Sequence, residues 1–414
     1  MGFQQGLSGL NAASKNLDVI GNNVANSTTV GFKSSSTVFA DVYANSLVGG
    51  GANAVGIGVG VLDVAQNFSQ GNVSVSSNAL DLAINGSGFF RLSSSGATVY
   101  SRNGQFHLDR DGYIVNAAGA NLTGYQADAA GNIIQSGAQN LRVTSNNIDP
   151  SATTEANIVA NLDSRSPALA AAAFDLNDPT TYTSATSMTV YDSLGNPHAM
   201  SIYFVKTAAN SWEVFGANDG AQVDGDTVTA GLQALGTVSF TAGGQINTGT
   251  TDFPLAVPLT TTTGATSPYS VTLDFSGTTQ FGTGFGVTEL RQDGYTAGRP
   301  TGFSISDTGI VLANYSNGQT LAQGQVVLAN FTNPNGLQPM GNNNYGETAE
   351  SGQPLVGAAL TGNLGSLQAG AVEESNVDLT QELVAMITAQ RVYQANAQTI
   401  KTQDQVLQTL VNLR

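Results

Sequence analysis

The sequence predicts a mainly β protein whose two ends form an α-helical coiled coil, with nested β domains between them. Three observations support this fold class. Residues 372–414 contain neither glycine nor proline, although the chain has 49 glycines and 11 prolines. The first 24 residues show a weaker helical spacing of apolar side chains. Between the ends, short segments alternate apolar and polar residues and are separated by turn sequences, as in strands joined by hairpins.

Apolar residues recur every seven positions in the C-terminal segment, at Leu379, Met386, Tyr393, Ile400 and Leu407. A second series, four residues later in each heptad, holds Leu383, Ala397 and Val411, with Gln390 and Asp404 as interruptions. Such a repeat predicts a long coiled-coil helix. Ser375 and Asp378 resemble a capping box, so we expect the helix to begin beside them.

A weaker repeat covers the N-terminal segment, where the seven-residue series is Phe3, Leu10, Leu17 and Val24, with Ala13 and Ile20 between them. Gly6 and Gly9 weaken the first helical turns, and Gly21 lies where we expect the helix to begin to end. The asparagines that follow favour the unwinding of the chain. We expect Phe32 to anchor the next loop against a neighbouring molecule.

Strand patterns fill the middle of the chain in two blocks with an insertion between them. Clear strand segments are 88–92, 98–109, 112–116, 187–206, 269–275, 309–319 and 324–331. Composition shifts near residues 147 and 293 indicate an inserted domain. We therefore predict three domains: an inner coiled-coil assembly domain (1–71 and 372–414), a middle β domain (72–146 and 294–371), and an outer β domain (147–293) inserted in the middle one.

Charge and cysteine content exclude several classes of protein. The net charge is -16 and lies mostly in the middle of the chain, which argues against nucleic acid or anionic membranes as partners. The chain has no cysteine, so disulfides and cysteine-ligated metals are excluded. We find no apolar run long enough for membrane insertion. The N-terminus lacks the pattern of a cleavable secretory signal, so we expect a cytoplasmic protein unless another export route is used.

Signals for an enzyme are weak, and we expect no catalytic, metal-binding or cofactor-binding residues. The two histidines, His107 and His198, are isolated from each other in the sequence, and we expect both at the surface. The segment "DRDG" (109–112) predicts a tight turn rather than a calcium loop. The segment "GIGVGV" (56–61) lacks the third glycine of a dinucleotide fingerprint and predicts an extended strand.

The terminal helices could form a hairpin within one chain or a contact mainly between subunits. Their polar faces carry Gln, Asn, Ser and Thr instead of the charges that make an isolated coiled coil soluble, which favours contacts between subunits. The candidate assembly residues are Leu10, Leu17, Ile20, Val24, Phe32, Leu379, Leu383, Met386, Tyr393, Ile400, Leu407 and Val411.

Several segments resemble the bacterial flagellar axial proteins, the family of rod and hook subunits. The first is "NLDVIGNNVANSTTVGFKSSSTVFADVY" (16–43), and the last is the segment that begins "ESNVDLTQELVAMITAQ" at residue 374. The segments 85–125, 192–206 and 324–345 also resemble this family, and the weakest similarity lies within 207–290. The resemblance is closest to hook subunits, because the distal rod proteins are shorter and lack most of 147–293.

The resemblance implies a fold, a function and a set of partners. Hook subunits have an inner coiled-coil layer and two outer β domains, and they polymerise into a curved tube that transmits torque as a universal joint. The implied partners are other copies of the chain, the distal rod protein, the hook–filament junction protein, the hook cap and the flagellar type III export apparatus. The implied location is the extracellular flagellum, reached without a cleavable signal peptide.

Two alternatives remain at this point. A distal rod or junction protein would share the terminal helices. A secreted β-rich adhesin with a coiled-coil stalk is a hypothesis of another class, and it predicts exposed clusters of aromatic residues on the outer β domain. Trp212 is the single tryptophan, and the tyrosines are scattered along the sequence.

Overall fold

The computed structural model describes residues 2–42, 56–223 and 233–412. The chain forms two compact units. Unit 1 comprises Met1–Ser145, Gly302–Asn314 and Thr320–Arg414, and unit 2 comprises Asn146–Thr301 and Tyr315–Gln319. Unit 2 is thus an insertion in unit 1, near the predicted insertion at 147–293. The finer division of the remainder into an inner and a middle domain stays a prediction.

Both terminal segments are helical, with α1 at Gly2–Ala25 and α2 at Leu379–Asn412. Asp378 caps α2, because its Oδ1 accepts hydrogen bonds from the N–H groups of Thr380 (2.9 Å) and Gln381 (3.1 Å). Ser375 takes no part in this cap, and its hydroxyl instead accepts a bond from the N–H of Val377. The expected capping box was therefore wrong. The first helix also continues four residues beyond Gly21.

Unit 1 contains most of the strands, in one twelve-stranded sheet and three two-stranded sheets. The large sheet follows the order β21-β22-β23-β9-β5-β6-β25-β24, with β7, β8, β10 and β26 paired beside it, and the small sheets are β1-β2, β27-β4 and β28-β3. The strands of the N-terminal part are β1 (Ser35–Val42), β2 (Gly58–Gln66), β3 (Val73–Val75), β4 (Leu82–Asn85), β5 (Phe89–Ser94), β6 (Ala97–Ser101), β7 (Phe106–Leu108), β8 (Ile114–Asn116), β9 (Asn121–Ala127) and β10 (Ile133–Asn140). Those that follow unit 2 are β21 (Pro300–Ile305), β22 (Ile310–Tyr315), β23 (Thr320–Asn330), β24 (Gln338–Gly341), β25 (Asn344–Gly346), β26 (Leu355–Ala358), β27 (Ser366–Ala369) and β28 (Ala371–Glu373).

The core of unit 1 joins residues from both halves of the chain. Phe90 and Leu92 of β5 pack with Val326 and Leu328 of β23, and Leu328 lies opposite Phe90 in the antiparallel register. Full burial of side chains of this size stabilises a fold by about 1.5–3 kcal/mol each. The segments before and after unit 2 therefore form a single folded unit.

Unit 2 is a sandwich of two five-stranded sheets. One sheet has the order β17-β18-β11-β19 with β20 paired to β11, and the other has β12-β13-β14-β15 with β16 paired to β14. The strands are β11 (Glu155–Asp163), β12 (Ser184–Tyr191), β13 (Pro197–Ala208), β14 (Ser211–Asn218), β15 (Ala221–Val223), β16 (Gly236–Ser239), β17 (Leu255–Leu259), β18 (Tyr269–Asp274), β19 (Thr279–Phe281) and β20 (Gly286–Gln292).

Alternating side chains of the two sheets meet in one core. Ile158 of β11 and Val271 of β18 pack with Ile202 of β13 and Trp212 of β14, and all four are fully buried. The indole Nε1–H of Trp212 donates a 2.6 Å hydrogen bond to Oε1 of Gln280, so the polar part of the ring is satisfied within the core. This core is separate from that of unit 1. The mainly β fold class with terminal helices is thereby confirmed.

Candidate assembly interface

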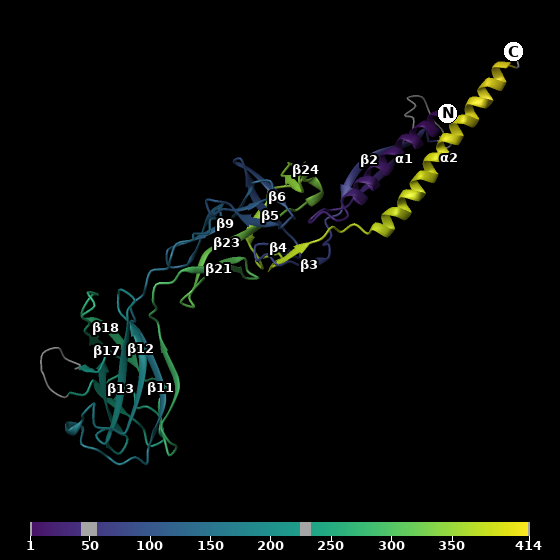
Figure 1. Ribbon diagram of the computed structural model, residues 1–414. Helices are drawn as coiled ribbons and strands as arrows, with labels where there is room; N and C mark the ends of the chain where they lie inside the picture. The colour runs from purple at the N-terminus through teal and green to yellow at the C-terminus, as the bar shows by residue number, and fades with distance from the viewer. Residues whose placement is uncertain (1, 43–55, 224–232, 413–414) are drawn as a thin grey trace. The chain divides into compact units, whose positions relative to one another are not determined.

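The two terminal helices pack antiparallel, and glycines allow their close approach (Figure 1). A Cβ atom at Gly6 would lie 3.0 Å from Cγ1 of Ile400, and one at Gly9 would lie 2.8 Å from the side-chain amide of Asn396. These glycines weaken an isolated helix by about 0.5–1 kcal/mol each relative to alanine. Their presence is explained by the helix–helix contact, which leaves little room for a larger side chain.

Asn23 links the end of α1 to the next strand and to α2. Its buried Nδ2 donates to the carbonyl of Ser35 (2.8 Å) and to Oε1 of Glu382 (3.0 Å), and its Oδ1 accepts from the N–H of Ser35 (2.9 Å). The amide is thus satisfied on both sides, as a buried polar group must be. The direction in which the chain leaves the helix is fixed by these three bonds.

The predicted assembly residues near the N-terminus are mostly covered by their own chain. Ile20 is buried, and Leu10, Leu17, Val24 and Phe32 are half-buried. These side chains therefore contribute first to packing within the subunit. Their contact with other copies stays a prediction.

The predicted assembly residues of α2 are divided between covered and exposed positions. Met386 and Ile400 are half-buried, whereas Leu379, Leu383, Tyr393 and Leu407 are exposed, and the side chain of Val411 lies outside the described residues. Within the chain, the contact with α1 uses Glu382, Ala389 and Asn396, each one residue before a position of the predicted second series. The hydrogen bond from Asn23 to Glu382 and the close approach of Gly9 to Asn396 both lie in this displaced register.

Exposed apolar side chains occur around much of α2. Besides the exposed residues already named, they include Val384, Ile387, Val392 and Val406. At 100° per residue these positions cover more than half of the helix circumference, whereas an amphipathic surface helix has one apolar side. Exposed apolar side chains that recur on several sides of one helix are normally covered by other protein.

A β-hairpin formed by β1 and β2 packs on α1. Nε2 of Gln5 donates to the carbonyl of Gly56 (2.7 Å), and the N–H of Val59 donates to Oγ of Ser8 (3.3 Å). Gly58 lies so close to Ser8 that no Cβ atom would fit there. The extended strand predicted from "GIGVGV" is confirmed, and its glycine permits the contact with the helix.

A groove lies between α1, α2 and this hairpin, with a volume of about 660 Å³. We call it the α1–α2 groove. Small side chains line most of it, including Gly9, Ala12, Ala385 and Ala389, and none of its lining residues is charged. A groove that is lined mostly by small, uncharged side chains can accept large apolar side chains from another helix.

Three buried charged side chains, which we call the charged cluster, connect the terminal segments to the large sheet. Nζ of Lys33 lies 2.6 Å from Oε1 of Glu373, and Nη1 of Arg102 lies 3.0 Å from Oε2 of the same carboxylate. The N–H of Gly71 also donates to Oε1 of Glu373 (2.9 Å), and Nζ of Lys33 donates to the carbonyl of Ser69 (2.7 Å). The cluster thus joins four separate segments of unit 1.

Electrostatics in the charged cluster follow from its burial. Burial lowers the pKa of Lys33 and that of Arg102, while the charge and hydrogen bonds of Glu373 act to raise both. The charged cluster was not predicted from the sequence. A signal was present, because Lys33 is the single charged residue between Asp18 and Asp41 and follows a glycine and a phenylalanine.

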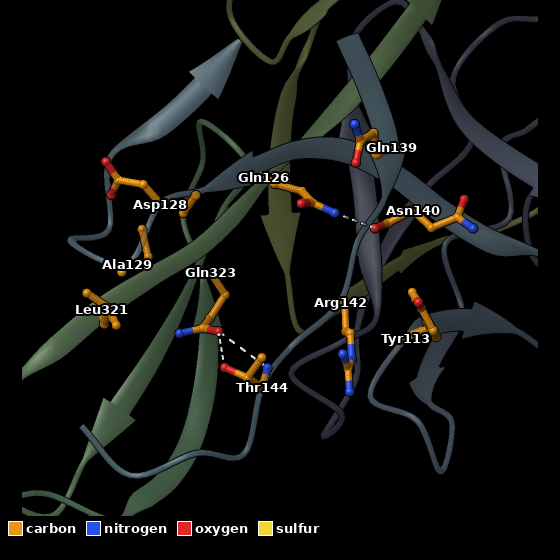
Figure 2. A pocket seen from close by; sticks show the side chains of 12 residues that line it. Tyr113, Gln126, Asp128, Ala129, Gln139, Asn140, Arg142, Thr144, Leu321 and Gln323 are labelled. Carbon is orange, nitrogen blue, oxygen red and sulfur yellow. Dashed lines mark hydrogen bonds between the residues drawn. The ribbon is translucent and has the colours of Figure 1, made fainter. Parts of the chain in front are cut away.

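A polar hollow of about 740 Å³ lies on the large sheet, beside β9, β10 and β23 (Figure 2). The Arg142 guanidinium lies 5.9 Å from the ring centre of Tyr113, and Thr144 donates a 2.8 Å hydrogen bond to Oε1 of Gln323. Figure 2 shows the amide groups of Gln126 and Gln139 on the same side of the hollow as Asn140. The amides, the Asp128 carboxylate and the guanidinium of Arg142 suit hydrogen bonding to another polar surface.

His198 is buried, so the surface position predicted for it was wrong. It is only 5% exposed, and its Nδ1 lies 2.6 Å from Oδ2 of Asp219, while its Nε2 lies 3.3 Å from Oδ2 of Asp192. Burial acts to lower the pKa of His198, but the two carboxylates outweigh it and raise that pKa. His107 is exposed as expected. The "DRDG" turn is confirmed by the bond from the N–H of Gly112 to the carbonyl of Asp109.

Within residues 2–42, 56–223 and 233–412, no group of three or more His, Asp or Glu side chains is placed to hold a metal ion. None of the helices in that part of the chain is long and apolar enough to cross a membrane. Across the described residues, the terminal helices carry many exposed apolar side chains. This surface and the multi-domain β fold are typical of a structural protein.

Comparison with known proteins identifies the class more closely. Four family models match successive parts of the chain: "Flagella basal body rod protein" at residues 3–33, "Flagellar hook protein FlgE/F/G D1 domain" at 83–158, "Flagellar basal body protein FlaE D2 domain" at 161–295, and "Flagellar basal body rod FlgEFG protein C-terminal" at 368–413. These descriptions belong to axial structural proteins of the bacterial flagellum.

Similar full-length proteins give the particular family. The flagellar hook protein FlgE of Escherichia coli is 45% identical over 421 residues, with 100% of each chain covered, and that of Rhizobium meliloti is 33% identical, with 100% of this chain and 98% of the relative covered. The crystal structure of Helicobacter pylori FlgE2 shares the fold at a TM-score of 0.52 and 14% identity, covering 72% of this chain and 100% of that one. The chain belongs to the flagellar hook protein family. It is a subunit of the flagellar hook.

Proposed function

We propose that the chain assembles into the hook tube by enclosing α2 with helices of neighbouring copies, and that this inner layer carries the torque. The observation that supports the proposal is the distribution of exposed apolar side chains around α2, from Leu379 at its start to Leu407 near its end. Among the described residues, α1 covers one side of this helix and leaves the other apolar side chains exposed. Neighbouring copies would remove the remaining apolar area from water, at about 25 cal/mol per Å².

The β parts support the flexible role of a universal joint. Unit 2 has its own core, so its folding does not depend on the helices. The two ends of its main segment, Asn146–Thr301, lie side by side, with a bridge between Ile148 and Gly298 and another between Ser151 and Tyr295. We propose that outer β surfaces slide past one another as the tube bends, because weak, wet contacts between polar surfaces are easily remade.

The proposal extends to location and partners. The assembled tube would lie outside the cell and would join the distal rod protein at one end and the hook–filament junction protein at the other. Growth would involve a hook cap and export of the subunit by the flagellar type III apparatus. The chain itself would have a structural role and no enzymatic one. The adhesin alternative loses its main support, because Trp212 is buried in the core of unit 2.

Substitution Leu407→Asp tests the assembly role of α2. We expect loss of tube formation at concentrations where the wild-type chain assembles, because a carboxylate would enter an apolar contact. Electron microscopy and sedimentation measure assembly, and Trp212 fluorescence verifies that unit 2 stays folded. The control is Gln398→Asp, which places the same charge at an exposed polar position of the same helix. Normal tubes from the Leu407→Asp chain would contradict the proposal.

A further inference from the structure

The last turns of α2 extend beyond α1, and no helix or strand among the described residues pairs with them. Gly6 faces Ile400 in the antiparallel contact, so Gly2, the first residue of α1, is level with about residue 404. Residues 405–412, which we call the overhang, therefore continue for about 12 Å at 1.5 Å per residue. Figure 1 shows α2 continuing past the N-terminus of α1.

The overhang continues the side of α2 that contacts α1. Leu407 lies seven residues after Ile400, which keeps it on nearly the same side of the helix. Ile400 is half-buried against Gly6, whereas Leu407 is 52% exposed and its neighbour Val406 is 49% exposed. The overhang thus presents an apolar contact side from which the partner helix is missing.

The overhang and the α1–α2 groove are complementary in size and charge. The overhang sequence, "QVLQTLVN", has no charged residue in a chain of net charge -16, and no charged residue lines the groove. Six of the 13 residues that line the groove are glycine or alanine, and the overhang supplies the exposed side chains of Val406 and Leu407. Large side chains on one helix and small ones on its partner allow close interdigitation.

The overhang cannot reach the groove of its own chain. The overhang and the α2 residues that line the groove belong to the same continuous helix, and Val392 in the groove lies 15 residues, or about 22 Å, from Leu407. Any contact between them must therefore join two copies. Because it would use two different surfaces, each added copy leaves one overhang and one groove free, and such a head-to-tail contact forms an open helical assembly wherever its rotation does not close a ring.

We propose that the overhang of one subunit docks in the α1–α2 groove of another, as the head-to-tail contact that propagates the inner layer of the tube. This inference rests on the proposed assembly function and adds the identity of the two surfaces. It assigns to the exposed end of α2 a specific partner, namely a second copy of this chain. The remaining exposed apolar residues of α2 would meet other neighbours.

Disulfide cross-linking tests the contact, because the chain has no cysteine of its own. The double variant Leu407→Cys/Val392→Cys is assembled into tubes, oxidised, dissociated in denaturant and separated without reductant. A bridge between these positions within one chain is excluded, since a disulfide requires Cα atoms within about 7 Å. We expect a ladder of trimers and larger species. Co-assembled single variants, Leu407→Cys with Val392→Cys, should give dimers and no ladder.

Two further variants make the result decisive. Val406→Cys/Val392→Cys tests the same contact through the neighbouring side chain, so the outcome does not depend on one substitution. Leu62→Cys/Val392→Cys tests whether the exposed hairpin fills the groove instead. The docking inference would be overturned if tubes form but neither the Leu407→Cys/Val392→Cys chain nor the Val406→Cys/Val392→Cys chain cross-links on oxidation. It would also be overturned if only the Leu62→Cys/Val392→Cys chain cross-links. Either result would leave the assembly function intact. Absence of tubes from the wild-type chain would instead refute the assembly function.

Discussion

Buried charge at a single residue links distant parts of unit 1. Glu373 is 1% exposed and accepts hydrogen bonds from Lys33, Arg102 and the N–H of Gly71. An ion pair of this kind is costly to break from one side, because the remaining charges stay buried without compensation. The cluster therefore holds the end of the N-terminal segment and the start of the C-terminal one in a single arrangement.

Substitution Glu373→Gln tests this role. We expect unit 1 to lose about 3–5 kcal/mol of unfolding free energy, because two buried cations would lose their counter-charge. Calorimetry and amide exchange of unit 1 measure the loss, while Trp212 fluorescence follows unit 2. The control is Glu374→Gln at the adjacent exposed residue, for which we expect a change within about 0.5 kcal/mol. Equal effects of the two substitutions would contradict the role of the cluster.

His198 makes the stability of unit 2 depend on pH. Its pKa is raised above the unfolded value of 6.5, so the stabilisation is fully present below about pH 6.5 and is lost as pH rises through the folded pKa. Hydrogen bonds, including those from Thr263 and His198, overcome burial and lower the pKa of Asp192, and His198 similarly lowers that of Asp219. Their stabilisation is present above the unfolded value of 3.8 and is lost as pH falls through their folded values.

We therefore expect the thermal midpoint of unit 2, followed by Trp212 fluorescence in the full chain, to decline as pH rises above 6.5. His198→Gln should remove most of this decline, because it removes the titrating group between the two carboxylates. His107→Gln, at the exposed histidine, should preserve it. A wild-type midpoint that stays constant from pH 6 to pH 9 would refute this assignment.

At the scale of secondary structure, local sequence patterns predicted most helices and strands. They failed where pairing with a distant segment determines the structure. Alternation predicted β13 and β18, and the absence of glycine and proline predicted α2. Residues 371–373 lack these breakers too, yet they form β28 by pairing with β3, some 300 residues earlier in the chain. Periodicity describes a segment by itself and contains no information about such a pairing.

In the candidate assembly interface, too, local sequence patterns predicted some features, whereas contacts between distant residues determine others. Heptad spacing identified which helices carry apolar surface, including Ile20 and Ile400. It could not give the displaced register of the α1–α2 contact, which depends on the polar bond between Asn23 and Glu382. The burial of His198 was also missed, because it follows from Asp219, a residue 21 positions away that approaches only in the folded sandwich.

The close contact of the two helices gives a prediction for Gly9. Gly9→Leu should raise the protein concentration required for assembly about tenfold, because the new side chain would overlap Asn396 and overpacking costs about 1–3 kcal/mol. The control is Gly21→Leu, since no atom lies within 4 Å of a Cβ built at Gly21. Sedimentation of assembled material at a series of concentrations measures the effect. A smaller effect at Gly9 than at Gly21 would show that the helices do not pack this way in the tube.

At the scale of the whole molecule, the chain separates two tasks between its ends and its insertion. The ends expose apolar helices, whereas unit 2 encloses a complete core around Trp212. Assembly and outer-surface contacts can therefore be changed independently. With this separation, the proposed joint could be stiff in twist and soft in bending. The packed helices would resist twist, and the outer β surfaces would allow bending.

Deletion of residues 152–294 tests this separation. Ser151 and Tyr295 exchange two 3.0 Å backbone hydrogen bonds, so joining them directly would leave the ends of the connection close to their native positions. We expect the shortened chain to fold its unit 1 core and to form tubes through its helices, with altered curvature and bending stiffness because the sliding outer surfaces are gone. Electron microscopy gives the curvature, and thermal fluctuation of long tubes gives the bending stiffness. Tubes of normal curvature and stiffness would show that the inner layer alone governs bending.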